Sequence, residues 1–453
     1  MKKQTRTYLL IAVLVTLLLS ACNPDVRAGD PTATPMPFFP ATPEVTQEPL
    51  LLINPTPTAN LTNPNPIRIT ELEYLQEDTE LLIMAKLFNT LDDAILRDVQ
   101  LEVLALDASG NRIAQRRTSF RYLFPGETTG LVQEFELNSG LVITAIEVRV
   151  VDGLIDRTLK YSQPLTVFNT SAYRYGNESR VTGWLKNTDA YTYTQVALNA
   201  VAYNEFGQIV GGGISTFDFV PGKDEVGFSL WVNSRRGETV DHVDVHPWLT
   251  SYSASLEDGN WWNSVSVDEW NFAIDQYNQI TGGAVLTNKT DQILTETFAI
   301  LTVSDENNRV CFASADYYDV IWPKETVLYA NRLSRLPDSC QGKNVDLVIV
   351  PGEFGQFPAD FNPLLATQAG FSEKEKVNVS VINNLNVSVS HAHVYVVLRN
   401  SSGQIVGGGY QTSELIRSGS STSVSVRVAY LGNQEELSVQ AFATLPADVE
   451  FGQ

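Results

Sequence analysis

The heptapeptide GQIVGGG occurs at residues 207–213 and again at 403–409. Its two copies start 196 residues apart, which is about twice the length of a small domain, so further copies of a shorter unit are expected. A glycine-rich loop that binds phosphate needs a strand before it and a helix N-terminus after it. Neither glycine triplet opens a helical pattern. The heptapeptide therefore indicates internal duplication, and we expect each triplet to mark a bulge or a close approach of neighbouring backbone.

Four signals recur in one order along the chain. Each copy has an apolar strand that ends in asparagine, then a turn 20 or 21 residues later, a second turn about 36 residues after the asparagine, and a last strand about 59 residues after it. The asparagines are 98, 101 and 95 residues apart and are Asn89, Asn187, Asn288 and Asn383. Such recurrence predicts four structural repeats. Only the second and fourth carry the heptapeptide, which indicates duplication of a two-repeat unit.

Apolar residues alternate with other residues inside each repeat. Before the first asparagine, the inward positions are Ile83, Ala85 and Leu87. Alternation between Gly, Asn and Pro turns is typical of half-buried strands. Six or seven short strands in about 95 residues, without a long helical stripe, predict a two-sheet sandwich of immunoglobulin-like type. We therefore expect an all-β chain with four tandem β-sandwich modules at 67–160 (module 1), 161–256 (module 2), 257–358 (module 3) and 359–453 (module 4).

The repeats resemble the FxLYD-type domain, a small immunoglobulin-like β-sandwich common in extracytoplasmic bacterial proteins. The resemblance is carried by V-x-G-x-x-x-N at 181–187, L-x-L-D-x-x-G at 104–110 and P-G-E at 125–127. Module 3 departs from it, with Asn308 and Lys324 in place of turn glycines, and module 4 has Ser-Gly-Ser at 418–420 instead of the proline turn. That family is not defined by a catalytic site, so the resemblance implies a fold and no active residues.

The first 21 residues have the pattern of a secretory signal peptide. A basic start, MKKQTR, precedes a fourteen-residue apolar run at 8–21, shorter than the roughly 20 residues that cross a membrane. The run LSAC at 19–22 resembles the bacterial lipobox, whose cysteine is lipidated and becomes the mature N-terminus. We expect lipidation at Cys22, with the membrane as a partner and the protein lipid-anchored on the extracytoplasmic face of the cell membrane. An ordinary cleaved signal followed by a chance cysteine is the alternative.

Residues 22–66 are predicted to be a disordered proline- and threonine-rich linker. Eleven of the chain's 21 prolines lie in 23–66. Proline favours an extended backbone, and such a segment cannot bury a core. We interpret it as a tether; a proline-rich ligand for another domain is the alternative.

Charge and motif content exclude several functions. The formal charge of −21 argues against nucleic acid as a partner. The chain has no G-x-S-x-G elbow, and its acidic residues are scattered over four similar units. We therefore predict no catalytic residue, no cofactor and no enzyme activity. The hypothesis is a non-catalytic cell-surface binding or spacer protein, with a protein or a polysaccharide as partner.

The cysteines and histidines give one positive prediction. Cys311 and Cys340 are expected to form a disulfide in an oxidising location, the alternative being two buried thiols. His242 and His246 lie on one strand, as do His391 and His393. Such pairs can ligate zinc, but a third ligand is missing, so no metal site is predicted and the histidines are expected to face solvent.

Aromatic residues give the candidate ligand site. Six of the seven tryptophans lie between residues 184 and 270. Exposed rings can stack on sugars or anchor a protein partner. The alternative to the spacer hypothesis is therefore a carbohydrate-binding surface protein, and for Trp261 and Trp262 it competes with packing between modules. The candidate ligand-binding residues are Trp184, Tyr191, Tyr193, Trp261 and Trp262.

Overall fold

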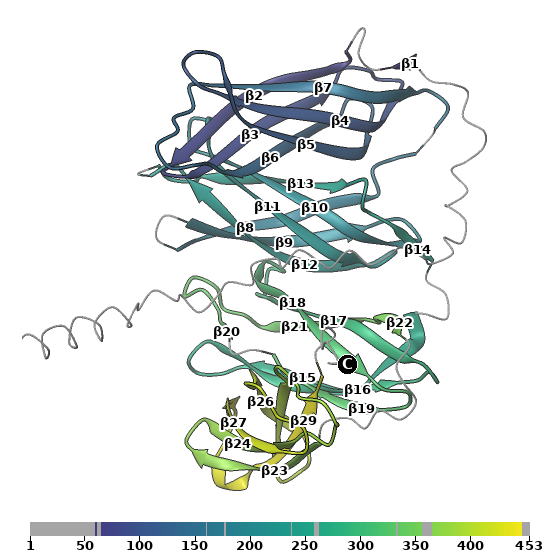
Figure 1. Cartoon of the computed structure of the whole chain (residues 1–453), viewed down its shortest axis with the longest axis vertical. Coiled ribbons are helices and arrows are strands. Elements are labelled where there is room, and N and C mark those ends of the chain that lie inside the picture. Colours follow the sequence, from purple (N-terminus) through teal and green to yellow (C-terminus); the bar gives the residue numbers. More distant parts are fainter. Residues whose placement is uncertain are drawn as a thin grey trace, which may run out of the picture. The chain divides into compact units, whose positions relative to one another are not determined.

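The computed structural model describes residues 59–60, 65–159, 161–175, 178–236, 238–257, 262–331, 334–355 and 365–445. The predicted signal peptide, Cys22 and most of the predicted linker lie outside these residues. The described part contains strands β1 to β29 and two single-turn 3₁₀ helices, η1 (Trp262–Ser264) and η2 (Gln434–Glu436), as Figure 1 shows. The strands pair antiparallel. The prediction of an all-β protein is confirmed.

Module 1 has two antiparallel sheets. Its strands are β1 (Ala59–Asn60), β2 (Ile67–Glu77), β3 (Glu80–Asn89), β4 (Ile95–Leu106), β5 (Arg112–Leu123), β6 (Thr128–Glu136) and β7 (Ala145–Asp156). One sheet has the order β2-β3-β6 and the other β1-β7-β4-β5. β1 differs from the sequence prediction, because residues 59 and 60 of the predicted linker pair with β7. An edge strand such as β7 offers unpaired backbone groups that a passing segment can join.

Module 2 forms one larger sheet. Its strands are β8 (Leu165–Tyr175), β9 (Glu178–Asn187), β10 (Tyr191–Tyr203), β11 (Ile209–Val220), β12 (Glu225–Ser234), β13 (His242–Leu249) and β14 (Ser255–Glu257). The strand order is β13-β10-β11-β12-β9-β8, with β14 also paired to β10. The pairing of β11 with β12 joins what are two separate sheets in module 1.

Modules 3 and 4 return to separate sheets. Module 3 contains β15 (Val265–Ile274), β16 (Gln279–Asn288), β17 (Ile293–Ser304), β18 (Val310–Ile321), β19 (Thr326–Tyr329), β20 (Ser334–Arg335), β21 (Asn344–Val350) and β22 (Glu353–Gly355). Module 4 contains β23 (Leu365–Glu373), β24 (Lys376–Ile382), β25 (His393–Arg399), β26 (Ile405–Thr412), β27 (Ser421–Arg427), β28 (Ala429–Tyr430) and β29 (Ser438–Thr444). The main sheet orders are β15-β16-β19, β18-β17-β21, β23-β24-β27 and β28-β26-β25-β29.

Alternating residues of each module supply an apolar core. Ile83, Ala85 and Leu87 are fully buried in the core of module 1, as the period-two pattern predicts. Three further clusters are centred on modules 2, 3 and 4. Each core therefore forms from strands that lie close together in the sequence.

The recurring asparagine ties the end of one strand to the second turn. Asn89 is fully buried, and its Nδ2 donates hydrogen bonds to the carbonyl oxygens of Ala94 at 3.0 Å, Leu123 at 3.2 Å and Phe124 at 2.9 Å. Its Oδ1 accepts the backbone N–H of Leu91 at 3.0 Å. A short amide that both donates and accepts suits a buried strand end, where backbone groups must be paired.

The other three asparagines occupy the same topological position. All are fully buried. In each of the four modules, the backbone N–H of the asparagine donates to a carbonyl oxygen at the equivalent position of the second turn. The acceptors are Glu127, Asp224, Glu325 and Ser420. The Nδ2 atoms of Asn187, Asn288 and Asn383 also bond to turn carbonyls. The structure thus repeats the arrangement that the spacing predicts.

The glycine triplets lie where backbone from the opposite sheet comes closest. Gly211 and Gly212 pair with Ser234 and Asn233, and a Cβ added to Gly213 would lie 1.9 Å from the carbonyl oxygen of Trp231. In module 4, residues 407 and 408 pair with β28 in the same way. The expected close approach is confirmed. Modules 1 and 3 carry side chains at the matching positions, 114–116 and 312–314, and there the described strands β5 and β18 pair only within their own sheets.

Consecutive modules pack on each other through equivalent strands at all three contacts. β3 and β6 pack on β10 and β11, β9 and β12 pack on β17 and β18, and β16 and β19 pack on β25 and β26. The first contact buries Met84 and Val132 against Val201. The second buries Trp184 against Val310. We call these contacts joint 1–2, joint 2–3 and joint 3–4.

Candidate functional site

Trp184, the main aromatic candidate, lies in joint 2–3. Its indole is only 6% exposed, packs against Val310 and Ala313, and donates a hydrogen bond to the carbonyl oxygen of Asn308 at 3.0 Å. The ring does point away from the core of module 2, but module 3 covers it. The expectation of an exposed Trp184 that stacks on a ligand is therefore wrong.

The two tyrosines of β10 take part in internal contacts. Tyr193 is 5% exposed, and its hydroxyl donates to Asp189 Oδ2 at 2.6 Å. Tyr161 donates to the same carboxylate. Burial raises the pKa of Tyr193 and Tyr161. Burial also acts to raise the pKa of Asp189, but the two hydroxyl donors and the backbone N–H donors of residues 190 and 191 together hold it below the usual range. Tyr191 is half-buried and pairs with Glu257. The arrangement is that of a structural network.

Of the two neighbouring tryptophans of module 3, the structure describes only Trp262, and that residue has a packing role. Trp262 lies in η1 and packs partly buried against the core of module 2. This is the packing role that the sequence left as an alternative. Trp261 lies outside the described residues. Among the described candidates, the structure therefore brings together no exposed aromatic surface on module 2.

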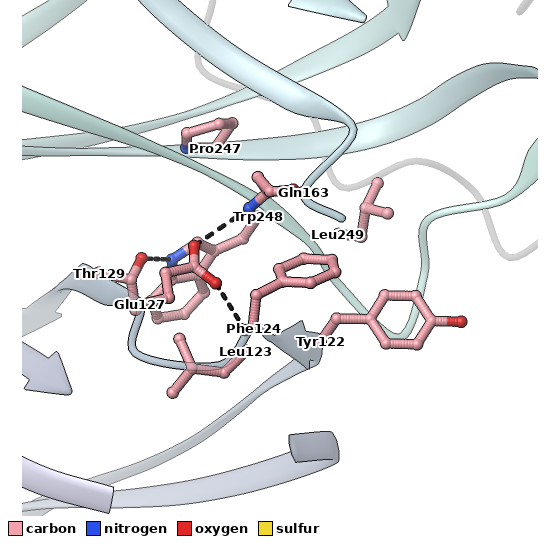
Figure 2. Close-up of a pocket in the computed structure, with 9 residues that line it drawn as sticks. All are labelled: Tyr122, Leu123, Phe124, Glu127, Thr129, Gln163, Pro247, Trp248 and Leu249. Atoms are coloured by element: carbon pink, nitrogen blue, oxygen red, sulfur yellow. Dashed lines mark hydrogen bonds between the residues drawn. The ribbon is translucent and has the colours of Figure 1, made fainter. Parts of the chain in front are cut away.

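Polar side chains of modules 1 and 2 hydrogen-bond to one another in a small, partly open pocket between them (Figure 2). Its volume is about 10 Å³, room for at most one water molecule. Glu127 accepts hydrogen bonds from the backbone N–H of Phe124 at 2.7 Å and from Gln163 at 3.1 Å. The indole of Trp248 donates to Thr129 at 2.6 Å. These groups hold the joint together and leave no room for a larger ligand.

Two half-buried carboxyls with raised pKa values close equivalent turns. Burial raises the pKa of Glu127 and brings that of Glu325 to about 7. Glu325 accepts the backbone N–H of Trp322 at 2.9 Å, as Glu127 does in module 1. A raised pKa often accompanies catalysis. Here each carboxyl closes a turn, so the shift has a structural cause.

The histidines do not assemble a metal site in the described part of the chain, where no three His, Cys, Asp or Glu side chains converge. His242 pairs with Asp241 at 3.2 Å. His391 and His393 lie with ring centroids 5.7 Å apart. His246 does not face solvent fully, which differs from the sequence expectation because module 1 covers part of it.

His246 lies in joint 1–2 with a buried ring nitrogen. A Cβ added to Gly130 would lie 2.6 Å from its Cδ2, so the two strands are close here. Its Nε2 is buried and has no hydrogen-bond partner among the described residues. Burial lowers the pKa of His246 to about 4; Lys86 adds to the shift and Asp244 opposes it. The joint therefore accommodates the neutral imidazole.

We expect His246 to make stability fall in acid. An unfolded histidine binds its proton near pH 6.5, so between about pH 6.5 and 4 the unfolded chain binds more protons than the folded chain. The free energy of unfolding should drop by up to about 3 kcal/mol over this range. His246→Asn removes this contribution. Urea unfolding at several pH values would measure it, with the exposed His242→Asn as control. An unchanged pH dependence in His246→Asn contradicts the prediction.

Cys311 and Cys340 form a disulfide, as the sequence predicts. Their Cα atoms are 5.7 Å apart and both residues are buried. The bond connects β18 to the segment before β21 and lies in the core of module 3.

An open cleft of about 890 Å³ lies beside joint 3–4. Three segments line it: the turn at 275–279, the turn at 374–375, and the chain from 427 to 435. Tyr277 is 54% exposed and Leu431 is 37% exposed. Small-molecule and sugar sites commonly have volumes of about 300 to 1,000 Å³. We call this the tyrosine cleft, and it is the candidate binding site of the structure.

The walls of the tyrosine cleft are held in place by hydrogen bonds. Asp275 Oδ1 accepts the backbone N–H groups of Tyr277 and Gln279, both at 2.8 Å. The Tyr430 hydroxyl donates to Gln434 at 3.1 Å, and the Tyr430 ring meets Phe371 edge-on. Internal hydrogen bonds therefore fix the turn at 275–279 and the segment at 430–434.

A second cleft occupies the equivalent place beside joint 1–2. It has a volume of about 620 Å³ and is lined by the β2–β3 turn with its flanking residues, one residue of β5, the end of β6, the start of β9 and the end of β12. It has no tyrosine, and its carboxylates outnumber its single Arg116, the acidic residues being Glu77, Glu80, Glu134, Glu136 and Glu178. We call it the acidic cleft.

The sequence interpretation missed the tyrosine cleft. Tyr277 and Tyr430 are far apart in the sequence, and neither belongs to the tryptophan-rich segment. One local signal exists: the turn between β15 and β16 spans residues 275–278, whereas the turn between β2 and β3 spans only 78–79. Aligning the repeats shows this longer turn but not the surface that it faces.

Comparison with known proteins gives no family. No family model and no curated protein matches the chain. Among solved structures, the chain is similar to native E. coli alpha-2-macroglobulin solved by cryo-EM, at 12% identity and a TM-score of 0.13. The match covers 84% of this chain and 27% of that chain, so this chain spans about a quarter of it. At this TM-score the similarity supports no conclusion about function.

A search of the described residues for a helix long and apolar enough to cross a membrane found none.

Proposed function

We propose that the chain is a lipid-anchored protein of the extracytoplasmic face of a bacterial cell membrane. Cys22 carries the lipid, the part of residues 22–66 before β1 forms the tether, and four immunoglobulin-like sandwiches act as a non-catalytic binding and spacer unit. Two or more acyl chains hold a protein on a membrane where one chain does not. The modules then present their surface beyond the lipid headgroups.

The repeated joint is the observation that best supports a spacer role. Joint 2–3 contains buried hydrogen bonds as well as apolar contacts: Thr182 Oγ1 donates to the carbonyl oxygen of Val310 at 2.5 Å, and the backbone N–H of Gly227 donates to Thr302 at 3.2 Å. In joint 3–4, Thr281 donates to the carbonyl oxygen of Ala429 at 2.5 Å. Directional bonds of this kind oppose hinge motion between modules, which is the property that a spacer needs.

Fractionation of cells that produce Cys22→Ser tests the anchor. We expect this variant in the medium or the soluble fraction, while the wild type stays with the membrane and is digested when protease is added to spheroplasts. Ser20→Ala is the matched control, because it changes the same motif and keeps the cysteine. Retention of Cys22→Ser in the membrane fraction, at the wild-type level, means that the anchor is wrong.

A further inference from the structure

We propose that the tyrosine cleft binds an uncharged polysaccharide chain, with Tyr277 as the ring on which a sugar stacks. The inference rests on the proposed binding role and names its ligand class. It starts from a comparison of the tyrosine cleft with the acidic cleft. The tyrosine cleft and the acidic cleft share three equivalent segments of the two module pairs, but β5 and β6 also line the acidic cleft and the side chains of the two clefts differ.

The equivalence of the two clefts follows from the asparagine spacing. Glu178 lies nine residues before Asn187, and Lys374 lies nine residues before Asn383. Each cleft also lies beside the strand that the glycine triplet brings across: Gly211 pairs with Ser234 of the acidic cleft, and Gly407 pairs with Tyr430 of the tyrosine cleft. The repeated heptapeptide therefore supports one wall of each cleft.

The side chains of the tyrosine cleft suit a ligand rich in hydroxyl groups. Tyr277 presents more than half of its surface, and a tyrosine ring offers a flat apolar face to the C–H groups of a sugar. Gln276 and Asn433 add amides that donate and accept hydrogen bonds. Exposed flat rings and amides together match a pyranose, which has apolar faces and a polar edge.

Charge favours an uncharged chain over an anionic one. Lys374 and Arg427 line the cleft together with three carboxylates, which are Asp275, Glu375 and Glu435. The whole chain has a formal charge of −21 and repels polyanions. An anionic polymer would meet no net positive surface here, whereas a neutral sugar can bond to both kinds of side chain.

Contacts within the protein hold the cleft in shape, and a preorganised site loses less entropy on binding. Thr281 and Ala429 fix joint 3–4 directly beside the cleft, and Arg399 Nη1 donates to both carboxylate oxygens of Glu269 at 2.8 Å across the same joint. Asn433 caps η2 by accepting the backbone N–H of Glu435. Hydrogen bonds within the protein thus position the residues of the cleft, so binding a ligand does not have to order them.

Calorimetric titration of the purified full-length protein tests the inference. The probes are cellohexaose, chitohexaose and mannohexaose as uncharged chains, with hexagalacturonate as the anionic comparison. We expect the wild type to bind at least one uncharged probe more tightly than hexagalacturonate. Tyr277→Ala should weaken that binding about tenfold, the loss of one stacking contact, while Tyr277→Phe should stay near wild type.

Tyr252→Ala is the control, because Tyr252 is 85% exposed on module 2 and lies outside both clefts. The inference is overturned if no uncharged probe binds, if hexagalacturonate binds more tightly, or if Tyr277→Ala binds like the wild type. Chromatography of the probes after titration shows whether the protein has cleaved them, so failure of the inference can be distinguished from failure of the proposed function. Shortened probes contradict the non-catalytic role even if the ligand class is right, and the Cys22→Ser fractionation stands independently of both.

Discussion

Alanine at Gly213 is expected to destabilise module 2 by about 3 kcal/mol or more. The new Cβ would lie 1.9 Å from the carbonyl oxygen of Trp231 and 3.0 Å from its carbonyl carbon. Backbone atoms cannot rotate aside as a flexible side chain can, and the pairing of Gly211 and Gly212 with β12 fixes this strand. Overpacking of a well-ordered core costs about 1–3 kcal/mol, and more where backbone must move. Urea unfolding followed by tryptophan fluorescence measures the loss.

Gly370→Ala is the matched control for Gly213→Ala. Gly370 also lies in a strand, but an added Cβ meets nothing within 4 Å. This variant should stay within about 0.5 kcal/mol of the wild type. Gly409→Ala should repeat the large effect in module 4, because its Cβ would lie 2.0 Å from the carbonyl oxygen of Arg427. Equal stability of Gly213→Ala and Gly370→Ala would show that the strands are not in close contact here.

Alanine at Asn288 is expected to cost about 4 kcal/mol in the unfolding of module 3. Its Nδ2 donates to the carbonyl oxygens of Gln292 at 2.8 Å, Ile321 at 3.1 Å and Trp322 at 3.0 Å, and its Oδ1 accepts the backbone N–H of Thr290 at 2.9 Å. Each buried group left without a partner costs about 1–3 kcal/mol, and water entering the turn recovers part of this. Chemical unfolding with a probe in module 3 gives the value, since the modules need not unfold together.

Two further variants separate the hydrogen bonds of Asn288 from its size. Asn344→Ala, on the exposed side of β21, should change stability by less than about 0.5 kcal/mol. Asn288→Asp keeps the shape but replaces the donor with a carboxylate that faces carbonyl oxygens. At neutral pH it should be at least as destabilising as alanine. A stable Asn288→Asp variant is the result that contradicts a donor role for this side chain.

The regular parts of the fold could be predicted from the sequence because their signals are local. Alternation places Ile83, Ala85 and Leu87 inward, and only a few neighbouring residues are needed to see it. The buried asparagines were found by spacing, because a residue with a fixed topological role recurs at the length of the repeat. The disulfide followed from the inward register of Cys311 and the absence of other partners in the modules.

The contacts between modules could not be predicted, because they join segments with no common local pattern. Trp184 has the outward register that the sequence assigns, yet an outward side chain is exposed only if no other module covers it. Its partner Asn308 lies 124 residues further along the chain. The glycine triplet predicts that another backbone segment lies close to it, but it does not predict that this segment is β12. The tyrosine cleft was missed for the same reason.

The three joints also bear on self-association. In joint 1–2, module 1 contributes the face formed by β3 and β6. This face contains the cross-strand pair Met84 and Val132, which module 2 buries. In module 4 the equivalent pair is Asn378 and Ser425, and both are exposed. Docking on this face would remove water from these polar groups, which costs free energy unless new hydrogen bonds replace those to water. The face of module 4 therefore lacks the apolar pair through which module 1 packs on module 2, so head-to-tail association of copies gains no such contact there.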